Sequence, residues 1–534
     1  MATKLHAEPE LRVRERTPIL KRSGMTLQEV LAGILANPPL GNSELPIAAL
    51  AYNSRNVANG TLFFAIRGEK TDGNLFVLDA IERGAAAICS EMAQPWGPEW
   101  QTLYAKAARA PQTREIPAHV AWVRIDDARK AMALAAANFY RRPAEALQLV
   151  GITGTNGKTT TSYLVDSILR AAGRTTGLSG TISYRTPSAK VDASTTTPES
   201  LDLQKFLGEV RDAGGDAAVM EASSHALAMD RLWGLHFDVA IFTNLTRDHL
   251  DYHKTFDDYF AAKRRLFEGV GKGKAATGVT NTDDPYGTQL CGVAARTITY
   301  GLTNGAQIIT KNYEITFAGL KFSAQTPAGK IDIESPLMGK INVYNILAAI
   351  GAGIALEIPN QTIAQGIAAL KSVPGRFERV DCGQPFLVIV DYAHTDDALK
   401  NLLATAKEIS RGGRIITLFG CGGDRDRTKR PLMGEAAGRA SDLVILTSDN
   451  PRSEDPLLII NDALVGLQRT RTPYKVEADR EKALALALDE ARAGDIMLLA
   501  GKGHETYQVL KDRTIDFDDR KMAANILRER GYEK

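Results

Sequence analysis

Gly151-Ile152-Thr153-Gly154-Thr155-Asn156-Gly157-Lys158-Thr159-Thr160 is the stretch of this sequence that decides its fold. An apolar run from Leu147 to Ile152 leads into it and a helical pattern follows, which predicts a strand, a glycine-rich turn and a helix. Backbone N–H groups of such a turn can surround phosphate oxygens, and the helix N-terminus adds positive potential. Lys158 would reach the terminal phosphates and the Thr159 hydroxyl would ligate Mg²⁺. We therefore expect the protein to bind ATP or GTP and to cleave the terminal phosphate bond.

The glycine spacing differs from that of the general phosphate-binding loop. That pattern has glycine five residues before Gly157, where this chain has Ile152. A structural turn would account for one glycine, but not for glycines at 151, 154 and 157 followed by Lys-Thr-Thr. Gly173 stands where a C′ glycine ends a helix. The apolar residues that mark this helix are Leu164, Val165, Ile168, Leu169 and Ala172.

Length and composition exclude several classes of protein. The chain has 534 residues, enough for two to four domains, and a net charge of +2, which argues against a nucleic-acid or membrane-surface binder. No apolar run approaches the roughly 18–20 residues of a membrane span. Residues 1–24 are charged and mixed, and we interpret them as a disordered leader. The four cysteines, far apart in the sequence, favour reduced thiols in a cytoplasmic enzyme: Cys89, Cys291, Cys382 and Cys421.

Three further blocks are predicted, at 25–147, 148–378 and 379–534. The first mixes short strands and helices, with a surface excursion expected from Gln94 to Ile116. The other two alternate apolar strands with helical patterns, which predicts parallel α/β sheets. The strands expected in the second block, after the first, are Ala217–Glu221, Phe237–Asn244 and Ala276–Asn281. Those of the third are Phe386–Val390, Ile415–Phe419, Leu443–Thr447 and Ile496–Ala500.

Polar residues follow these strands, at the sheet edge where open α/β sheets bind ligands. In the third block the clusters are 391–394, 420–427, 448–452 and 501–505, and we interpret them as one site. In the second block they are 220–225 and 243–253. Glu221 suits Mg²⁺, which prefers oxygen ligands. Spacing alone would make His249 a hydrogen-bonding residue and Lys263 a solvated helical lysine.

These motifs together resemble the Mur ligases of peptidoglycan synthesis. The matching runs include Gly154 to Thr159, Glu221 to His225, Thr243 to His253 and Ala262-Lys263, in order over nearly the whole chain after the leader. Runs in the third block resemble the members that add meso-diaminopimelate: Asp391 to His394, Gly422 to Asp426, Asp449 to Arg452 and Gly501 to Glu505.

The resemblance implies an α/β fold of three domains: an N-terminal UDP-binding domain, a central P-loop ATPase-like parallel-sheet domain and a C-terminal Rossmann-like domain. It implies an ATP-dependent, Mg²⁺-dependent ligase that joins meso-diaminopimelate to the D-Glu γ-carboxylate of UDP-MurNAc-L-Ala-D-Glu through an acyl phosphate. Such an enzyme serves cell wall biogenesis, cell shape and cell division. We expect a cytoplasmic monomer with an active site between domains and small-molecule partners, without nucleic acid or membrane insertion.

The resemblance also implies roles for single residues in catalysis. Lys158 stabilises the transferring phosphoryl group, Thr159 and Glu221 hold one Mg²⁺, and Glu221, His249 and Lys263 support a second. Lys263 matches a lysine that carries a CO₂-derived carbamate, which requires a neutral amine and so a depressed pKa. The residues expected to bind ATP are Gly154, Thr155, Asn156, Gly157, Lys158, Thr159, Thr160, Asn342, Asn345, Arg376, Asp391 and His394. Asn342 could equally be a helix cap.

The residues expected to bind UDP-MurNAc-dipeptide are Tyr52, Ser54, Glu69, Lys70, Thr71, Thr195, Thr196, Thr197, Ser223 and Arg231. The chain departs from the family pattern at some positions. Asn53 stands where aspartate is usual, Thr195 where asparagine is frequent, Met229 where glutamine is usual and Asp396 where proline is usual. Met229 removes an amide donor and acceptor.

Meso-diaminopimelate differs from lysine by a carboxylate at its far end, beside the distal amine. A guanidinium is the group that reads a carboxylate, and an unpaired buried arginine would be costly, so Arg452 argues against lysine. The residues expected to bind diaminopimelate are Arg425, Asp449, Asn450, Pro451, Arg452, Gly501 and Glu505. The alternatives are a lysine-adding or dipeptide-adding ligase, folylpolyglutamate synthase, and a nucleotide-regulated protein without ligase chemistry. That last protein would not need Glu221, His249 and Lys263 together.

Overall fold

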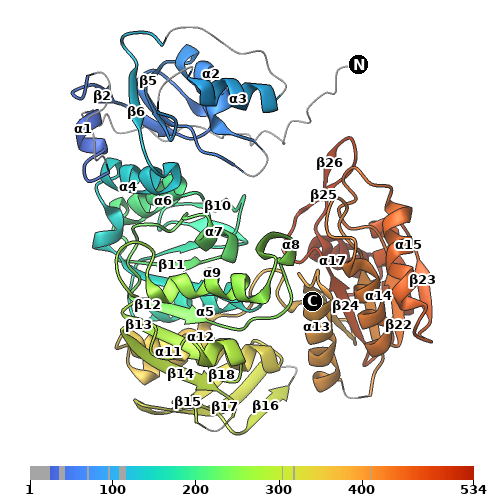
Figure 1. Cartoon of the computed structure of the whole chain (residues 1–534). Helices are drawn as coiled ribbons and strands as arrows, with labels where there is room; N and C mark the ends of the chain where they lie inside the picture. Colours follow the sequence, from blue (N-terminus) through green and yellow to red (C-terminus); the bar gives the residue numbers. More distant parts are fainter. Residues whose placement is uncertain are drawn as a thin grey trace. The chain divides into compact units, whose positions relative to one another are not determined.

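The computed structural model of the chain describes residues 24–34, 42–68, 71–93, 97–107, 116–303, 305–316, 319–410 and 412–533. The chain forms two compact units, Met1–Arg141 and Arg142–Lys534, and each is described by itself (Figure 1). The predicted leader lies outside the described residues except for Gly24. The predicted domain boundaries at 147 and 378 stay predictions. Among the helices of the described ranges, none has both the length and the apolar character that crossing a bilayer requires.

The first unit is built on a parallel sheet in the order β3 (Ala49–Ala51), β4 (Thr61–Phe64), β5 (Ala85–Ser90) and β6 (Ala121–Arg124). Residues of β4 and β5 are buried on both faces, as expected for parallel strands covered on two sides. A short antiparallel pair joins β1 (Met25–Thr26) and β2 (Pro46–Ile47). The helices of the unit are α1 (Leu27–Val30), α2 (Val77–Glu82), α3 (Pro98–Lys106) and α4 (Ala128–Phe139).

We predicted that residues 94–116 form a surface excursion, and this prediction is wrong for the part that forms helix α3. Helix α3 places Trp100 and Tyr104 in the core of the first unit, where both are buried. The Trp100 ring lies 5.8 Å from the Trp122 ring of β6. The local richness in charge and proline hid two aromatic anchors four residues apart, which is the spacing of one helix face. Residues 94–96 and 108–115 of the segment lie outside the described residues.

The second unit contains a large mixed sheet with β7 (Gln148–Thr153) at its centre. Its parallel part runs in the order β8 (Thr176–Ser179), β11 (Ala217–Glu221), β7, β12 (Val239–Phe242), β13 (Thr277–Asn281), β14 (Arg296–Gly301) and β15 (Ile308–Ile309). The strands predicted in this block are therefore confirmed, with β11 correct to the residue. Because β11 and β12 flank β7, the polar residues after these strands meet the glycine-rich turn at one edge.

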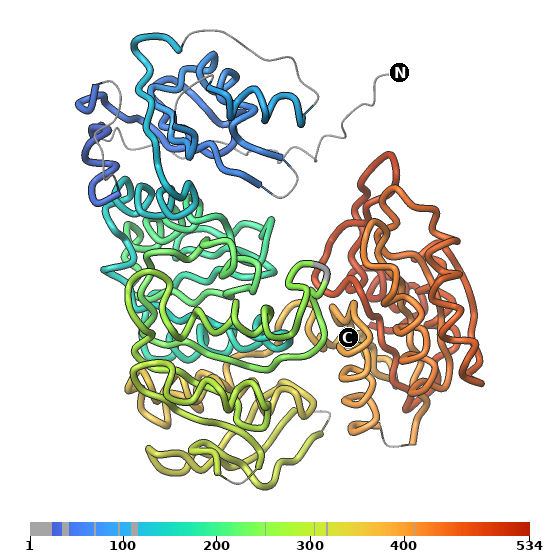
Figure 2. The backbone as a smooth tube through the Cα atoms, viewed as in Figure 1, coloured from blue at the N-terminus to red at the C-terminus, as the bar shows by residue number. Residues whose placement is uncertain are grey.

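Antiparallel strands extend this sheet at both ends, and sequence analysis did not predict them. Beyond β8 lie β9 (Ser183–Arg185) and β10 (Lys190–Asp192). Beyond β15 lie β17 (Gly319–Thr326), β16 (Tyr313–Thr316) and β18 (Gly329–Ser335), which form the yellow part of the trace in Figure 2. β17 and β18 alternate apolar and polar residues, from Leu320 to Gln325 and from Lys330 to Glu334, a strand signal that sequence analysis overlooked. β9 and β10 have only three residues each, too few to show an alternation.

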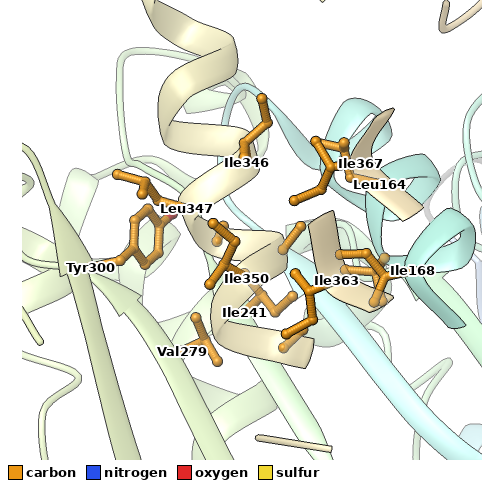
Figure 3. Close-up of a cluster of buried hydrophobic side chains, with 14 of the residues drawn as sticks. Leu164, Ile168, Ile241, Val279, Tyr300, Ile346, Leu347, Ile350, Ile363 and Ile367 are labelled. Carbon is orange, nitrogen blue, oxygen red and sulfur yellow. The ribbon is translucent and has the colours of Figure 1, made fainter. Parts of the chain in front are cut away.

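Helix α5 (Lys158–Ala171) begins directly at the glycine-rich turn and ends as predicted. Gly173 adopts a φ of 78°, and Arg174 N–H reaches back to the Leu169 carbonyl at 3.0 Å, which is a Schellman-type end. The apolar face of α5 packs against two further helices and the sheet (Figure 3). Each fully buried leucine or isoleucine there stabilises the fold by about 1.5–3 kcal/mol. The helices of this part are α5, α6 (Ser200–Asp212), α7 (Ser224–Ala228), α8 (Leu250–His253), α9 (Phe256–Glu268), α10 (Pro285–Thr288), α11 (Lys340–Ala355) and α12 (Asn360–Ala369).

A second sheet of this unit runs in the order β19 (Glu378–Val380), β20 (Leu387–Asp391), β24 (Ile496–Ala500), β21 (Ile415–Phe419), β22 (Leu443–Leu446) and β23 (Tyr474–Val476). All its pairings are parallel except β19 with β20, and separate apolar clusters cover its two faces. Sequence analysis located β20, β21, β22 and β24. A short hairpin pairs β25 (Tyr507–Val509) with β26 (Thr514–Asp516). The helices are α13 (Asp396–Ile409), α14 (Lys429–Ala440), α15 (Pro456–Leu467), α16 (Arg480–Glu490) and α17 (Asp519–Glu529).

Candidate active site

Two glycines of the turn before α5 are required by close packing. Gly154 has a φ of 142°, and a Cβ atom there would lie 1.8 Å from Thr243 Oγ1. Gly157 has a φ of 87°, and a Cβ atom there would lie 2.4 Å from Asn345 Oδ1. Both positions combine a positive φ with no room for a side chain, which only glycine tolerates. The turn is therefore a fixed loop between β7 and α5.

Residues after β12 hold the loop in place. Thr155 N–H donates to the Asn244 carbonyl at 2.8 Å, and Asn156 N–H donates to Asn244 Oδ1 at 2.9 Å. Thr243 Oγ1 donates to the Asn156 carbonyl at 2.6 Å. The structure thus brings the predicted cluster at 243–253 to the phosphate loop, as the strand order requires.

Lys158 folds back over this loop. Its Nζ donates to the carbonyls of Gly154 at 3.0 Å and Thr155 at 2.8 Å. Desolvation lowers the pKa of Lys158, while Glu221 and Asp248 favour the charged form. The ammonium thus lies at the loop where phosphates are expected. A phosphate would give it a full negative charge as hydrogen-bond acceptor, whereas the two carbonyls offer only partial charges.

Thr159 and Glu221 meet as predicted for a magnesium site. Thr159 Oγ1 donates to Glu221 Oε2 at 3.2 Å, and the Glu221 carboxylate is buried. Thr181 also donates to this carboxylate, from its N–H at 2.9 Å and its Oγ1 at 3.0 Å. Sequence analysis missed Thr181, because it follows β8, a short strand that was not predicted. A carboxylate and a hydroxyl held together beside the phosphate loop fit Mg²⁺, which takes oxygen ligands.

Lys263 is not the solvated helical lysine that spacing alone suggested. Only 1% of the residue is exposed, and Nζ donates to the Gly154 carbonyl at 2.8 Å from α9. Burial, with the nearby Lys158 ammonium, holds the pKa of Lys263 well below its usual value. A neutral amine is the form that reacts with CO₂, and a carbamate nitrogen would keep one N–H for the Gly154 carbonyl. The position therefore fits the predicted modification.

His249 lies in a group of aromatic side chains at the start of α8. Its ring centroid is 4.8 Å from that of His225 and 6.1 Å from that of Tyr259. Desolvation lowers the pKa of His249 to about 4, although Asp248, with its Oδ2 3.3 Å from Nε2, favours the charged form. His249 is therefore neutral near pH 7, as a metal ligand must be.

The structure joins the predicted metal residues only in part. Lys158 and Lys263 act on the charge of His249, which places the three groups close together. Across the described ranges, however, no set of three or more His, Cys, Asp or Glu side chains forms a metal-binding group. The Thr159–Glu221 pair is assembled, whereas a second metal position would depend on a modified Lys263.

The predicted ATP-side residues of α11 lie inside that helix. Gly339 is the N-cap, so Asn342 is not the cap, and its Nδ2 donates to the Met338 carbonyl at 2.7 Å. Asn345 Nδ2 donates to Asn342 Oδ1 at 2.9 Å, and Thr161 Oγ1 donates to Asn345 Oδ1 at 3.4 Å. The two amides therefore connect α11 with α5 just behind the phosphate loop.

Arg376 reaches the Thr159–Glu221 pair from the segment before β19. Its Nη2 donates to Thr159 Oγ1 at 3.2 Å, and its guanidinium lies 4.9 Å from the centroid of the Tyr392 ring. Asp391 Oδ2 accepts from Phe377 N–H at 2.7 Å, and burial raises the pKa of Asp391. His394 Nδ1 lies 2.8 Å from the Tyr392 carbonyl. Through Arg376, which contacts both Tyr392 and Thr159, the end of β20 is thus connected with the first turn of α5.

Thr197 is the centre of the predicted muramoyl-peptide segment. Its Oγ1 donates to the Glu221 carbonyl at 2.7 Å and accepts from Ser223 N–H at 3.1 Å. Arg231 Nη1 donates to the Thr197 carbonyl at 2.8 Å, and Arg231 Nε lies 3.0 Å from Glu199 Oε1. The segment is therefore fixed to the end of β11, where Glu221 lies.

Thr195 and Thr196 extend this segment towards β9. Thr196 Oγ1 lies 3.2 Å from Thr181 Oγ1, within hydrogen-bond distance. The Tyr184 hydroxyl donates to the Thr195 carbonyl. Thr195 Oγ1 donates to the Thr197 carbonyl at 3.2 Å, so threonine forms a local bond at this position.

The predicted nucleotide-binding residues Tyr52, Ser54 and Thr71 belong to the first unit. Ser54 is buried in a 3₁₀ turn, and its hydrogen bond is the largest cause of the lowered pKa of Asp79. Asn53 caps that turn, because its Oδ1 accepts from Arg55 N–H at 3.1 Å. Aspartate could accept the same bond. The predicted residues Glu69 and Lys70 lie outside the described residues.

A polar cluster forms where β22 and β24 end, as predicted for the amino-acid site. Asn450 Nδ2 donates to Glu505 Oε2 at 2.8 Å. The Lys502 ammonium, fully buried, lies 3.3 Å from Glu505 Oε2 and 3.8 Å from Asp449 Oδ1. Burial first, and the like charge of Asp449 next, raise the pKa of Glu505, while Lys502 opposes this. Sequence analysis missed Lys502, although it stands in the quoted cluster 501–505 and could have been found there.

Arg452 stands at the rim of this cluster with a φ of 51°. Its Nη1 donates to the carbonyls of Gly423 at 2.8 Å and Asn450 at 3.4 Å. Among the described residues, none accepts a hydrogen bond from Arg452 Nε or Nη2, so one side of the guanidinium stays available. Gly501 has a φ of 108°, and a Cβ atom there would lie 2.7 Å from Asp449 Oδ2. Pro451 is buried beside Arg452, whereas Arg425 is exposed and unbonded within the described ranges.

Comparison with known proteins identifies the family. Residues 152–353 match the Mur ligase middle domain, 375–503 the Mur ligase glutamate ligase domain, and 46–140 the catalytic domain of the Mur ligase family. The chain is 53% identical over 514 residues to the UDP-N-acetylmuramoyl-L-alanyl-D-glutamate–2,6-diaminopimelate ligase of Solibacter usitatus, covering 96% of this chain and 100% of the relative. The chain belongs to the Mur ligase family.

Two further relatives agree with this membership. The ligase of the same name from Geobacter metallireducens is 43% identical over 526 residues, covering 95% of this chain and 99% of the relative. A solved structure of a protein of that name superposes with a TM-score of 0.64 at 31% identity, over 95% of this chain and 99% of the other. The predicted three-domain α/β fold and the predicted ATP-dependent, amide-forming ligase are confirmed.

Asp396 shows what a departure from the Mur ligase pattern does in this chain. Thr395 caps α13, and Asp396 Oδ1 accepts from Arg247 Nη2 at 3.0 Å. The next residue, Asp397, accepts from Asn156 Nδ2 at 3.0 Å through Oδ2. Where proline is usual, the loop therefore gains an ion pair with the segment that follows β12.

Met229 is a second departure with a visible contact. Arg231 Nη2 lies 3.6 Å from Met229 Sδ, within hydrogen-bond distance of a weak acceptor. The amide that glutamine would offer is absent here. Arg231 nevertheless stays fixed by the Thr197 carbonyl and Glu199.

Proposed function

We propose that this Mur ligase joins meso-diaminopimelate to the γ-carboxylate of D-Glu in UDP-MurNAc-L-Ala-D-Glu, with ATP converted to ADP and phosphate. The observation that carries the proposal is the cluster Asp449–Asn450–Arg452–Glu505, which offers acceptors and a guanidinium together. The names of relatives up to 53% identical over nearly the full length agree with it and favour diaminopimelate over lysine. The product is a precursor of peptidoglycan.

The first step activates the γ-carboxylate. One of its oxygens attacks the γ-phosphorus of ATP and ADP leaves, which forms an acyl phosphate. Positioning and charge neutralisation dominate such phosphoryl transfers. Lys158 is placed to turn from the carbonyls of Gly154 and Thr155 to the phosphates, and Arg376 Nη2 lies 3.2 Å from Thr159 Oγ1. Thr159 and Glu221 would hold Mg²⁺, which neutralises phosphate charge when bound.

Lys263 is proposed to act as a carbamate. The support is its burial, its lowered pKa and its hydrogen bond to the Gly154 carbonyl, all beside Lys158. Carbamylation would convert the neutral Lys263 amine into an anion beside the Lys158 ammonium. With Glu221 and a neutral His249, this anion would complete a second cation position.

The second step forms the amide. The amine attacks the acyl carbon, and phosphate leaves with one oxygen of the original carboxylate. Asp449 and Glu505 face a single ammonium, Lys502, so on this side of the cluster the carboxylates outnumber the ammonium groups by one. This excess suits the distal ammonium of the incoming amino acid, while the open side of Arg452 suits the distal carboxylate. We assign the nearer carboxylate to Arg425.

The remaining assignments follow the family. The UDP part is proposed to contact Tyr52, Ser54 and Thr71 of the first unit. The muramoyl-peptide part is proposed to contact Thr195, Thr196, Thr197, Ser223 and Arg231. A cytoplasmic monomer that uses small-molecule substrates remains our proposal.

An oxygen-label experiment tests the reaction. UDP-MurNAc-L-Ala-D-Glu carrying ¹⁸O in the γ-carboxylate is incubated with ATP, Mg²⁺ and meso-diaminopimelate, and phosphate and nucleotide product are analysed by mass spectrometry. We expect one ¹⁸O atom in each phosphate released and a product heavier by one diaminopimelate residue. Phosphate without ¹⁸O, or an unchanged nucleotide, would contradict the acyl phosphate route.

A further inference from the structure

Arg480 and Asp519 form a buried ion pair outside the residues assigned so far. Both side chains are 0% exposed. Arg480 Nε donates to Asp519 Oδ1 at 2.8 Å, and Nη2 donates to Asp519 Oδ2 at 2.6 Å. Arg480 is the first residue of α16 and Asp519 the first of α17, so the pair joins the N-terminal ends of two helices.

The rest of the guanidinium bonds two strand ends. Arg480 Nη1 donates to the Ser448 carbonyl at 3.3 Å, and Nη2 donates to the Ala500 carbonyl at 3.2 Å. Ala500 ends β24, and Ser448 lies two residues after β22, with β21 between these strands in the sheet. One side chain therefore links two strands that do not pair with each other.

The two carbonyls immediately precede the proposed amino-acid site. Asp449 follows Ser448, and Gly501 follows Ala500. Glu505 lies four residues beyond Gly501 and bonds Asn450 across the gap. The charges of Asp449 and Glu505 also act on Arg480, which confirms their proximity. Moving either strand end would therefore change the separation of Asp449 and Glu505, the proposed acceptors for the distal ammonium of diaminopimelate.

Stability alone is a poor explanation for this pair. Burying two charges carries a desolvation cost that their attraction often fails to offset, and apolar residues of similar size commonly stabilise as well. The planar guanidinium, in contrast, offers donors in a fixed fork that bonds four acceptors at set angles. What Arg480 adds beyond its charge is therefore a fixed geometry of hydrogen-bond donors.

We propose that Arg480, oriented by Asp519, is a positioning residue that sets the spacing between the Asp449–Asn450 loop and the Gly501–Glu505 loop and thereby the recognition of the amino-acid substrate. This role rests on the proposed function. The printed hydrogen bonds of Arg480 go to Asp519, Ser448 and Ala500, and so to no residue assigned to ATP or to the UDP-linked substrate, although Asp391 adjoins the second loop through the Gly501 N–H at 3.1 Å.

Two variants separate positioning from stability. Arg480→Lys keeps the charge beside Asp519 but loses the fork. The double variant Arg480→Met with Asp519→Leu removes both charges, so it leaves no unpaired buried ion. Arg414→Lys is the matched control, because Arg414 pairs with Asp495 at 2.7 Å where β21 and β24 begin, at the opposite edge of the sheet.

The measurements use the full-length enzyme: the thermal midpoint, and KM for meso-diaminopimelate, ATP and UDP-MurNAc-L-Ala-D-Glu. We expect both Arg480 variants to raise KM for diaminopimelate by about tenfold or more, since misplacing site groups by ~1 Å has effects of this size. The other two KM values should stay within about twofold, and Arg414→Lys should change only the midpoint.

The double variant decides between the two explanations, even if the Arg480→Lys variant does not fold. A folded double variant with raised KM for diaminopimelate supports positioning, whereas one with normal KM overturns it and leaves a structural pair. A double variant that does not fold also overturns it, because the pair would then be required for the fold itself. Wild-type enzyme that fails to use diaminopimelate would instead refute the proposed function.

Discussion

Gly180→Ala should displace the carboxylate that we assign to Mg²⁺. Gly180 follows β8, and a Cβ atom there would lie 2.3 Å from Glu221 Oε1 and 3.0 Å from Glu221 Cδ. The backbone φ of Gly180 is not in the left-handed region, so alanine adds volume without backbone strain. The perturbation is therefore one methyl group directed at one carboxylate.

The size of the displacement follows from these distances. Real Cβ atoms essentially never approach another atom within 3.0 Å, so a contact of 2.3 Å forces a shift of at least about 0.7 Å. Glu221 Oε1 accepts from Thr181 N–H at 2.9 Å and Oε2 from Thr159 Oγ1 at 3.2 Å, and the shift would stretch or break these bonds. We expect an overpacking cost of ~1–3 kcal/mol in stability. We expect a loss of up to about 100-fold in kcat, because a misplacement near 1 Å has effects of that order.

The assay is ligase activity over a range of Mg²⁺ concentrations, with thermal unfolding in parallel. Gly177→Ala is the matched control: Gly177 lies in β8, the strand that Gly180 follows, and its Cβ atom would lie 2.4 Å from Val210 Cγ2 in an apolar contact. The control should lose stability but keep its Mg²⁺ dependence. Gly180→Ala with wild-type kcat and wild-type Mg²⁺ dependence would refute the placement of the metal at Glu221.

Three further substitutions or conditions test other parts of the site. Arg452→Ala should raise KM for meso-diaminopimelate by about 10–100-fold, the loss of ~1.5–3 kcal/mol expected for a charge-assisted hydrogen bond, while acyl phosphate formation continues; equal loss of both would remove the assigned role. Lys263→Ala should be nearly inactive and partly restored by added small carboxylates such as formate, whereas full activity without them would exclude the carbamate. Falling pH should weaken diaminopimelate binding at a pH above the usual glutamate pKa of 4.5, because the pKa of Glu505 is raised and its protonated form no longer attracts an ammonium. A KM that stays constant down to pH 4.5, or an unchanged pH profile in Glu505→Gln, would contradict that assignment.

Strand positions were the part of the fold most open to prediction. β11, β21 and β24 were located to the residue, because each is a continuous apolar run followed by polar residues. The short strands β9 and β10 were missed, since three residues each carry too little periodicity. The helix α3 was missed because its two aromatic anchors stand in a polar, proline-containing segment.

The candidate site was predictable where a residue ends or follows a strand and lies within a motif. Glu221, Asn450 and Glu505 are of this kind, and the structure brings each to its expected cluster. Thr181 and Arg480 could not be found in this way. Thr181 follows an unpredicted strand, and Arg480 begins a helix and acts through backbone carbonyls, which no side-chain pattern reveals.

The central claim is that the site selects an amino acid with a distal carboxylate. The most direct measurement is phosphate release from ATP and Mg²⁺ with UDP-MurNAc-L-Ala-D-Glu, with meso-diaminopimelate or L-lysine added in parallel. The account predicts release with diaminopimelate and little with lysine, because lysine leaves Arg452 without its carboxylate. Release with lysine alone would keep the ligase and contradict the Arg452 assignment, and release with neither would contradict the proposed acceptor.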